Sequence, residues 1–445
     1  MTSPAAAGCG ASRGRRAGAG LYTALAGLFF GVNTAQLLFL PTAARAAGLG
    51  SLGVGIVIAV FTGIGVLTDL PASELANRRG VPVTMLIGCA LTVAGTAFFL
   101  AGQRAWSVLA GALVLGIGTS FLMNPILGGL SNLAGDNQLA WQLANVCVQR
   151  AGGLIAIVAL TAGGVSGPVP QGAWASVAGT AVIAVIALRL RPGDRAARRP
   201  APAGPPAAAS PPGSPAPPAA DPPGPPPGRL LARAVAVVRE SREAASGVAL
   251  ELVIPAMLVF GFSFLPQLRA GLHGALSAGT MLITREAAGL AVVAFAVLVL
   301  RPRRIAGIVG AALVLGAATM PLLAYSASPA ARLVAMGANG AVITVGIVAA
   351  NLHVYLGTTP ATRMYGFALS GIVSRISGIV FPILYGWSAG YSPRALVWCA
   401  CGTVVLAGAL YAGLQSGRTS KVPAPGGRPG RPGPAAEAGM KADHG

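Results

Sequence analysis

Residues 191–228 read RPGDRAARRPAPAGPPAAASPPGSPAPPAADPPGPPPG and divide the chain into two blocks. The stretch holds 15 of the 35 prolines and no Leu, Ile, Val, Phe, Met or Trp. It cannot bury enough apolar surface to offset the entropy cost of ordering, so its composition predicts a disordered or polyproline-like linker. On each side lies a block of roughly 170–190 residues that is dominated by long apolar runs.

The overall composition indicates an integral membrane protein. Hydrophobic residues make up 54% of the 445 residues, charged residues make up only 9%, and the mean hydropathy is +0.71. So few charges cannot solvate a soluble globule of this size. The formal net charge of +20 does not indicate a nucleic-acid binder, because the basic residues lie between apolar runs and not on one aromatic-rich face.

Each block contains six apolar runs that are long enough to cross a membrane. A hydrocarbon core of about 30 Å needs about 20 helical residues, and helices are required because lipid offers the backbone no hydrogen-bond partner. The predicted spans are residues 20–41, 51–70, 82–102, 105–128, 142–165, 171–190, 247–268, 276–300, 305–326, 330–356, 364–387 and 393–416. The predicted fold class is therefore all-α integral membrane, with 12 transmembrane helices in two six-helix halves.

The predicted organisation has five parts. They are a segment 1–19, an N-terminal half 20–190, a Pro-rich linker with an amphipathic helix 191–246, a C-terminal half 247–416 and a disordered tail 417–445. Lys and Arg gather in the first segment, the linker and the tail, which predicts that both termini and the linker are cytoplasmic. The basic, then apolar N-terminus resembles a secretory signal, but its length and the spans that follow favour an uncleaved first helix.

The end of the linker predicts a helix of its own. Leu231, Val235 and Val238 recur at helical spacing among charged residues, as in an amphipathic helix that lies on the inner membrane face. A plain extension of the seventh span is the alternative.

Two short repeats indicate that the halves are pseudo-symmetric. Residues 39–41 and 264–266 both read FLP, and residues 148–153 and 373–378 share the pattern VxRxxG, in each case at an offset of 225. Both matches place one span on the span six later, which is the sign of a duplicated six-helix unit.

This architecture resembles the major facilitator superfamily (MFS), and of its members the drug or metabolite efflux type. The resemblance covers about residues 20–190 and 247–416, and its most specific sign is the stretch DLPASELANRRG at 69–80. The superfamily has a loop there that reads roughly G-x-L-A-D-R-x-G-R. The positions that fit are Leu75, Ala76, Arg78 and Gly80, and those that depart are Ser73, Asn77 and Val81.

The resemblance implies a gating loop between the second and third spans. Its residues are Asp69, Glu74, Asn77, Arg78 and Gly80. Because Asn77 stands where the superfamily carries Asp, we expect Asp69 or Glu74 to supply the acid. In the fourth span, Ala112 stands where many proton-coupled members carry Arg, which weakens the resemblance to proton antiporters.

Three arginines fall about ten residues from a span end, near the membrane midplane: Arg150, Arg285 and Arg375. A charge at this depth costs about 2.5–3.5 kcal/mol, so each should face a cavity or a partner. Glu286 is the one acid of similar depth. Neighbours on a helix diverge by about 100°, so Arg285 and Glu286 are not expected to face each other, and an Arg from another helix is the candidate partner of Glu286.

The surplus of positive charge favours a substrate with an anionic group, because Arg presents a bidentate fork to carboxylate or phosphate. In the alternative, the arginines only hold helices together. Further candidate substrate contacts lie on the spans that line the central cavity in the superfamily: Asn33, Gln36, Asn124 and Asn351, with Gln267 and Asn339 beside them. Such amides also serve as interhelical hydrogen bonds.

Two residues are candidates for proton coupling. Glu286 is the one deep acid and His353 the one histidine in a span, and imidazole titrates near physiological pH. The alternative for His353 is a buried side chain with satisfied hydrogen bonds. No Walker A, HExxH or CxxC motif occurs, so no enzymatic activity, cofactor or metal is predicted.

The sequence thus predicts a secondary transporter in the cell membrane that exports a small organic metabolite or drug by alternating access. The alternatives are an importer of an organic anion or sugar-like solute, and a non-transporting sensor or scaffold with the MFS fold. Expected partners are the solute and the lipid bilayer, with protons as a candidate coupling ion and no nucleic acid. A monomer is expected.

Overall fold

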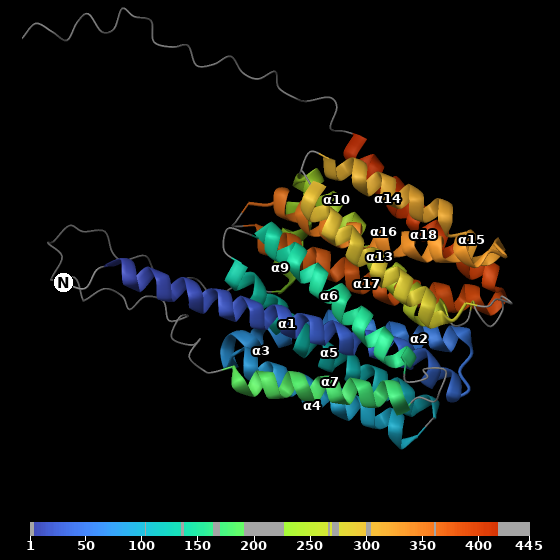
Figure 1. Ribbon diagram of the computed structural model, residues 1–445, viewed down its shortest axis with the longest axis horizontal. Helices are drawn as coiled ribbons and strands as arrows, with labels where there is room; N and C mark the ends of the chain where they lie inside the picture. The colour runs from blue at the N-terminus through green and yellow to red at the C-terminus, as the bar shows by residue number, and fades with distance from the viewer. Residues whose placement is uncertain are drawn as a thin grey trace, which may run out of the picture.

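The structure is a computed structural model. It describes residues 4–102, 104–134, 138–162, 170–190, 227–265, 268, 276–299, 304–359 and 362–416. In this part of the chain, 12 helices are long and apolar enough to cross a membrane, and no strand occurs. The helices form a two-part bundle (Figure 1), which confirms the predicted fold class. Most of the predicted linker, the tail and Gln267 lie outside the described residues.

In its described residues, the N-terminal half contains seven helical segments. They are α1 (Pro4–Ala46), α2 (Ser51–Gly63), α3 (Gly65–Arg79), α4 (Val81–Ala101), α5 (Ala105–Ala134), α6 (Gln138–Ala162) and α7 (Pro170–Arg189). The second span consists of α2 and α3, which meet at Ile64 between two glycines. The N-terminal end of α1 extends past the bundle (Figure 1).

The C-terminal half is preceded by α9 (Pro227–Glu240). Its spans are formed by α10 (Arg242–Leu250), α11 (Val253–Val259) and the π-helix η1 (Phe260–Phe264), then α13 (Ala278–Val299), α14 (Ile305–Thr319) with α15 (Leu322–Tyr325), α16 (Pro329–Leu356), α17 (Arg363–Tyr391) and α18 (Pro393–Ser416). The seventh span is thus interrupted twice. The first break, at Glu251 and Leu252, precedes Pro255, which has no N–H to donate and whose ring would clash with the Glu251 carbonyl.

The linker helix α9 is not a plain extension of the seventh span. Ser241 separates it from α10 in an extended conformation, and the Ser241 hydroxyl accepts a hydrogen bond from the Ala244 N–H at 3.2 Å. This is a regular N-cap. The helix packs against α17, with Ala234 buried but Val235 exposed. Its predicted position on the inner membrane face stays a prediction.

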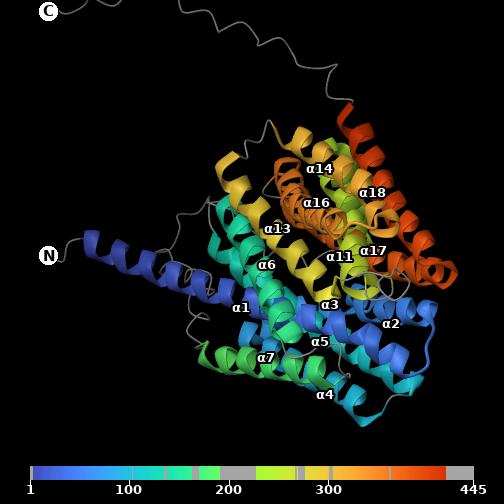
Figure 2. The ribbon, with the colours of Figure 1, turned by 45° about the vertical axis from the view of Figure 1, so that its right-hand side comes forward.

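The two halves meet through two pairs of helices. In one pair α2 packs along α17, and in the other α6 packs along α13; α1 and η1 add a smaller contact. Helices α4 and α7 lie on the far side of the N-terminal half, and α14 and α18 on the far side of the C-terminal half (Figure 2). By the 225-residue offset, α6 corresponds to α17, and the second span corresponds to the eighth. The two helix pairs are therefore pseudo-equivalent.

Candidate functional site

The first polar cluster between the halves joins α6 to α13. Arg150 of α6 donates a hydrogen bond from Nη1 to Glu286 Oε2 of α13 at 3.0 Å. Arg285 donates to Glu286 Oε1 from both Nε at 2.9 Å and Nη2 at 2.6 Å. The side chains of Arg150, Arg285 and Glu286 are 4%, 0% and 3% exposed. One buried carboxylate is thus shared by two buried guanidinium groups.

This geometry corrects one sequence expectation and confirms another. Arg285 and Glu286 were expected not to face each other, and this is wrong, because their side chains form an ion pair although their Cα–Cβ directions diverge. The long Arg285 side chain reaches back to its neighbour in the space where η1 and α16 close over α13. The candidate pairing of Glu286 with an Arg from another helix is confirmed by Arg150.

Glycines let the neighbouring helices approach Arg285 closely. A Cβ on Gly340 of α16 would lie 2.0 Å from the Arg285 carbonyl oxygen, and one on Gly261 of η1 would lie 1.8 Å from Arg285 Nη1. The Phe262 ring also lies under the guanidinium, with its centroid 3.8 Å from Arg285 Cζ. This is the geometry of a cation–π contact.

The cluster nevertheless keeps unsatisfied donors. Within the described part of the chain, Arg150 Nη2 and Arg285 Nη1 are buried without a hydrogen-bond partner, and so is Thr344 Oγ1 of α16. Native proteins leave few buried polar atoms in this state. The cluster therefore carries both an excess positive charge and free N–H groups.

The second polar cluster between the halves joins α17 to α3. Arg375 donates to Asp69 from Nε and from Nη2, each at 3.0 Å and each to a different carboxylate oxygen. Asn124 of α5 donates to Asp69 Oδ1 at 3.0 Å and to its carbonyl oxygen at 3.2 Å. The Arg375 and Asp69 side chains are 14% and 28% exposed. This pair is bidentate, balanced in charge and partly open to solvent.

Close packing of α2 against α17 holds this second cluster in place. A Cβ on Gly55 would lie 2.2 Å from the Pro382 carbonyl oxygen, and one on Gly386 would lie 2.5 Å from the Ser51 carbonyl oxygen. Thr62 also donates a hydrogen bond to the Gly378 carbonyl oxygen across the interface. Such close approach of two helices in lipid depends on small residues.

The remaining candidate substrate contacts are dispersed. Gln36 is buried inside the N-terminal half, where it donates to Ser176 Oγ at 3.2 Å. Asn339 is buried in the C-terminal half and donates to Met257 Sδ at 3.3 Å. Asn33 of α1 and Asn351 of α16 are half-buried. The structure brings none of these four into hydrogen-bond contact with the three arginines within the described residues, and their substrate roles stay predictions.

His353 lies within the C-terminal half, away from both clusters. Its Nδ1 is 2.7 Å from Glu243 Oε2 of α10, and its Nε2 is 2.8 Å from Tyr411 Oη of α18. The ring is completely buried. These contacts support the alternative of a satisfied buried side chain, and the coupling role of His353 stays a prediction.

The predicted gating loop lies at the end of α3. Glu74 and Arg78 form an exposed ion pair four residues apart at 2.5 Å, while Asp69 points to the other half. Gly80 follows with φ 95°, a conformation that favours glycine. The Asn77 side chain lies outside the described residues. The two acids offered for the loop are therefore used separately, by Arg78 and by Arg375.

Sequence reasoning assigned no role to two polar groups and missed one ion pair. Thr344 and Arg150 both border Gly289, since a Cβ on Gly289 would be 2.7 Å from Thr344 Oγ1 and 3.5 Å from Arg150 Nε. Glu251, at the break in the seventh span, accepts a hydrogen bond from Ser370 Oγ at 3.2 Å. The pairing of Asp69 with Arg375 was also missed. The small residues at 261, 289 and 340 were a signal of close packing, but Gly is so common in this chain that it does not stand out.

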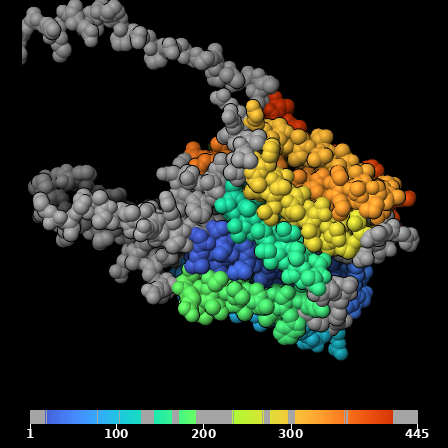
Figure 3. Space-filling view, viewed as in Figure 1, coloured from blue at the N-terminus to red at the C-terminus, as the bar shows by residue number. Residues whose placement is uncertain are grey.

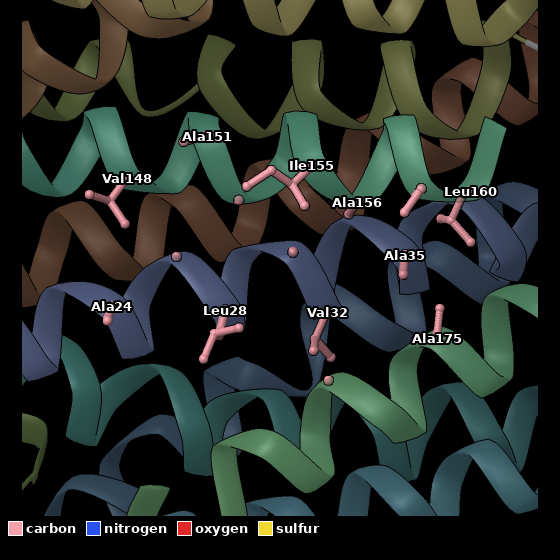
Figure 4. Close-up of a pocket in the computed structure, with 15 residues that line it drawn as sticks. Ala24, Leu28, Val32, Ala35, Val148, Ala151, Ile155, Ala156, Leu160 and Ala175 are labelled. Carbon is pink, nitrogen blue, oxygen red and sulfur yellow. The ribbon is translucent and has the colours of Figure 1, made fainter. Parts of the chain in front are cut away.

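An apolar groove of about 400 Å³ opens on another side of α6, between α1 and α7 (Figure 4). Figure 4 shows Val148 and Ile155 of α6, Leu28 and Val32 of α1, and Ala175 of α7 around it. In the space-filling view α1 is visible between α6 and α7 (Figure 3). The residues that line the groove are apolar and suit a hydrocarbon chain, and none of the charged candidate residues is among them.

No protein-family model matches this sequence, and no curated protein matches it. Solved structures do match its fold. The nucleoside transporter NupG has a TM-score of 0.65 at 15% identity, covering 89% of this chain and 99% of its own. The human organic anion transporter MFSD10 has a TM-score of 0.58 at 14% identity, and the match covers 89% of this chain and 99% of MFSD10. The E. coli fucose:proton symporter FucP has a TM-score of 0.55 at 13% identity, and the match covers 89% of this chain and 98% of FucP. The chain has the MFS fold. At these identities the likeness establishes the fold alone.

Proposed function

We propose that this chain is a secondary transporter of the MFS, which moves a small organic solute by alternating access. The observation that carries the proposal is the Arg150–Glu286–Arg285 cluster, because it joins the two halves of an MFS fold deep within the membrane spans. Transporters of this architecture bind solute near the midplane at the interface of their repeats. Buried ionisable groups in membrane helices are costly and mark such sites.

Three features of the proposal go beyond the fold. Export of a metabolite or drug is the direction that the sequence resemblance favours. The cell membrane with cytoplasmic termini follows from the distribution of Lys and Arg. Proton coupling through Glu286 would require a step in which two buried guanidinium groups lose their shared carboxylate.

The test is solute flux in proteoliposomes that contain the purified full-length chain. The first panel takes the solute classes of the structurally similar proteins, namely nucleosides, fucose and organic anions. We expect saturable flux of at least one class, and its loss in Arg150→Gln. Arg304→Gln is the matched control, since Arg304 is an exposed arginine at the start of α14, and it should retain the flux.

Membrane vesicles of defined orientation test the finer features. Inside-out and right-side-out vesicles separate export from import, and a pH dye inside them reports whether protons move with the solute. Absence of flux for every class, from folded protein, would contradict the proposed function and favour a sensor or scaffold.

A further inference from the structure

We propose that Arg150 and Arg285 form a binding site for one oxyanion group, a carboxylate or a phosphate, on the transported solute, with Glu286 as the resident counterion. The inference rests on the proposed function and names the substrate class. It depends on charge balance, on free hydrogen-bond donors and on the position of the site between the halves.

The charge balance of the cluster leaves one positive charge uncompensated. Two guanidinium groups share one carboxylate, and all three side chains are at most 4% exposed. Arg remains protonated in proteins, and removing an uncompensated charge from water is costly. A bound anion would neutralise the cluster.

The free donors are the right kind for an oxyanion. Arg150 retains Nη2 and Arg285 retains Nη1, so each half of the protein contributes one unused guanidinium nitrogen. Guanidinium N–H groups bind carboxylate and phosphate oxygens with short, charge-assisted hydrogen bonds. The unpartnered Thr344 hydroxyl, across Gly289 from Arg150, can donate as well. A neutral solute would leave the excess charge in place.

The site is closed in this structure, and its position explains how it would open. Gly261 of η1 lies directly against Arg285 Nη1. The same π-helix contacts α1 of the other half, where the Ser263 hydroxyl donates to the Leu37 carbonyl oxygen at 3.4 Å. Gly261 and Arg285 belong to the same half, so Nη1 is uncovered only when η1 moves off α13, and separation of α1 from η1 would release η1 for that movement. A rocking motion would also stretch the Arg150–Glu286 pair, and an oxyanion could then take the place of Glu286 on Arg150.

The other arginine between the halves serves as an internal comparison. Arg375 faces one carboxylate and engages both of its oxygens, and it uses its Nη1 on the Thr62 carbonyl oxygen at 3.4 Å. It has no excess charge to offer. The oxyanion site is therefore assigned to Arg150 and Arg285 and not to Arg375.

The test measures the Tm of the full-length chain in nanodiscs of zwitterionic lipid, which removes anionic headgroups as a source of phosphate. Acetate, benzoate and inorganic phosphate are titrated against acetamide and benzamide at constant ionic strength. We expect a saturable rise in Tm with the oxyanions and none with the amides. Arg150→Gln and Arg285→Gln should each weaken the apparent affinity by about 10- to 100-fold, and Arg304→Gln should not change it.

Two further arms make the result decisive. Arg150→Lys and Arg285→Lys keep the charge and serve if the Gln variants fold poorly; they should retain binding but with lower affinity. Adding anionic lipid to the nanodiscs should compete with the soluble oxyanions only if the site also accepts a headgroup. The proposal is overturned if no oxyanion raises Tm, if the amides raise it equally, or if the variants respond like the unmodified chain.

The outcome is separable from that of the flux assay. Oxyanion binding that depends on Arg150, without flux of any solute, would support the proposed binding site and contradict the proposed transport function. Flux of a neutral solute without oxyanion binding would support the proposed transport function and contradict the proposed oxyanion site.

Discussion

The two ion pairs that join the halves lie on pseudo-equivalent helices but differ in charge balance. Arg150 and Arg375 occupy the same place in the repeated pattern, and each reaches an acid of the opposite half. Asp69 gives both oxygens to one arginine, whereas Glu286 divides its oxygens between two. The Asp69–Arg375 pair is balanced in charge and suits a contact that holds the two halves together, called here the latch. The Glu286 cluster has an excess of positive charge and suits a ligand site.

The largest effect is expected from Glu286→Ala. It removes the one carboxylate between two buried guanidinium groups, and loss of one partner from a buried ion pair costs about 3–5 kcal/mol. The free energy of unfolding of the full-length chain in detergent would be measured by denaturant titration. Glu74→Ala is the control, because the Glu74–Arg78 pair is exposed and such pairs contribute about 0–1 kcal/mol. Equal effects of the two variants would show that the buried cluster is not held by its charges.

The contrast between the pairs also shows what the sequence could predict. That Arg150, Arg285 and Arg375 lie inside helices of membrane-spanning length followed from counting along apolar runs, because the thickness of the bilayer fixes the scale. The fold class followed from the same counting. The packing register of one half against the other could not be predicted in this way, because it depends on close packing at scattered glycines and not on a local period.

The partners of the arginines show where sequence reasoning ends. Adjacent positions on a helix diverge, but the Arg285 guanidinium lies at the end of a flexible side chain and returns to Glu286. Asp69 was assigned to a loop and instead reaches α17. Backbone periodicity predicts the direction of a Cβ atom, whereas the contacts of a long side chain depend on the surrounding helices.

A double-mutant cycle on the balanced pair gives the next effect. Asp69→Asn and Arg375→Gln, alone and combined, should give a coupling energy of about 1.5–3 kcal/mol, because the hydrogen bonds are charge-assisted. The same cycle with Glu286→Gln and Arg150→Gln should give the larger value, since that pair is more deeply buried. Unfolding in detergent is the measurement for both cycles. A larger coupling at Asp69 would reverse the assignment of latch and ligand site.

The packing that supports the balanced pair can be tested on one helix. Gly386→Ala would place a Cβ against the Ser51 backbone of α2, and overpacking of this kind costs about 1–3 kcal/mol. Gly390→Ala, one turn further along α17, meets nothing within 4 Å, and should leave stability unchanged or raise it by up to about 1 kcal/mol. Thermal unfolding of both variants compares them directly. If they behave alike, α2 and α17 do not depend on close contact at this point.

The smallest effect sharpens the description of the unbalanced cluster. Phe262→Leu removes the ring under Arg285 but keeps an apolar side chain, and a desolvated cation–π contact contributes about 0.5–2 kcal/mol. The loss should appear in the free energy of unfolding. Phe295→Leu on α13 is the control, because that ring is 62% exposed on the bundle surface.

Arg375 has a carboxylate to itself, whereas Arg285 shares one. The Phe262 ring should therefore contribute more to stability when less counter-charge is available to Arg285. Phe262→Leu should therefore lose more stability in the Glu286→Gln background than alone, and an equal loss in both would show that the ring contributes by packing and not by charge.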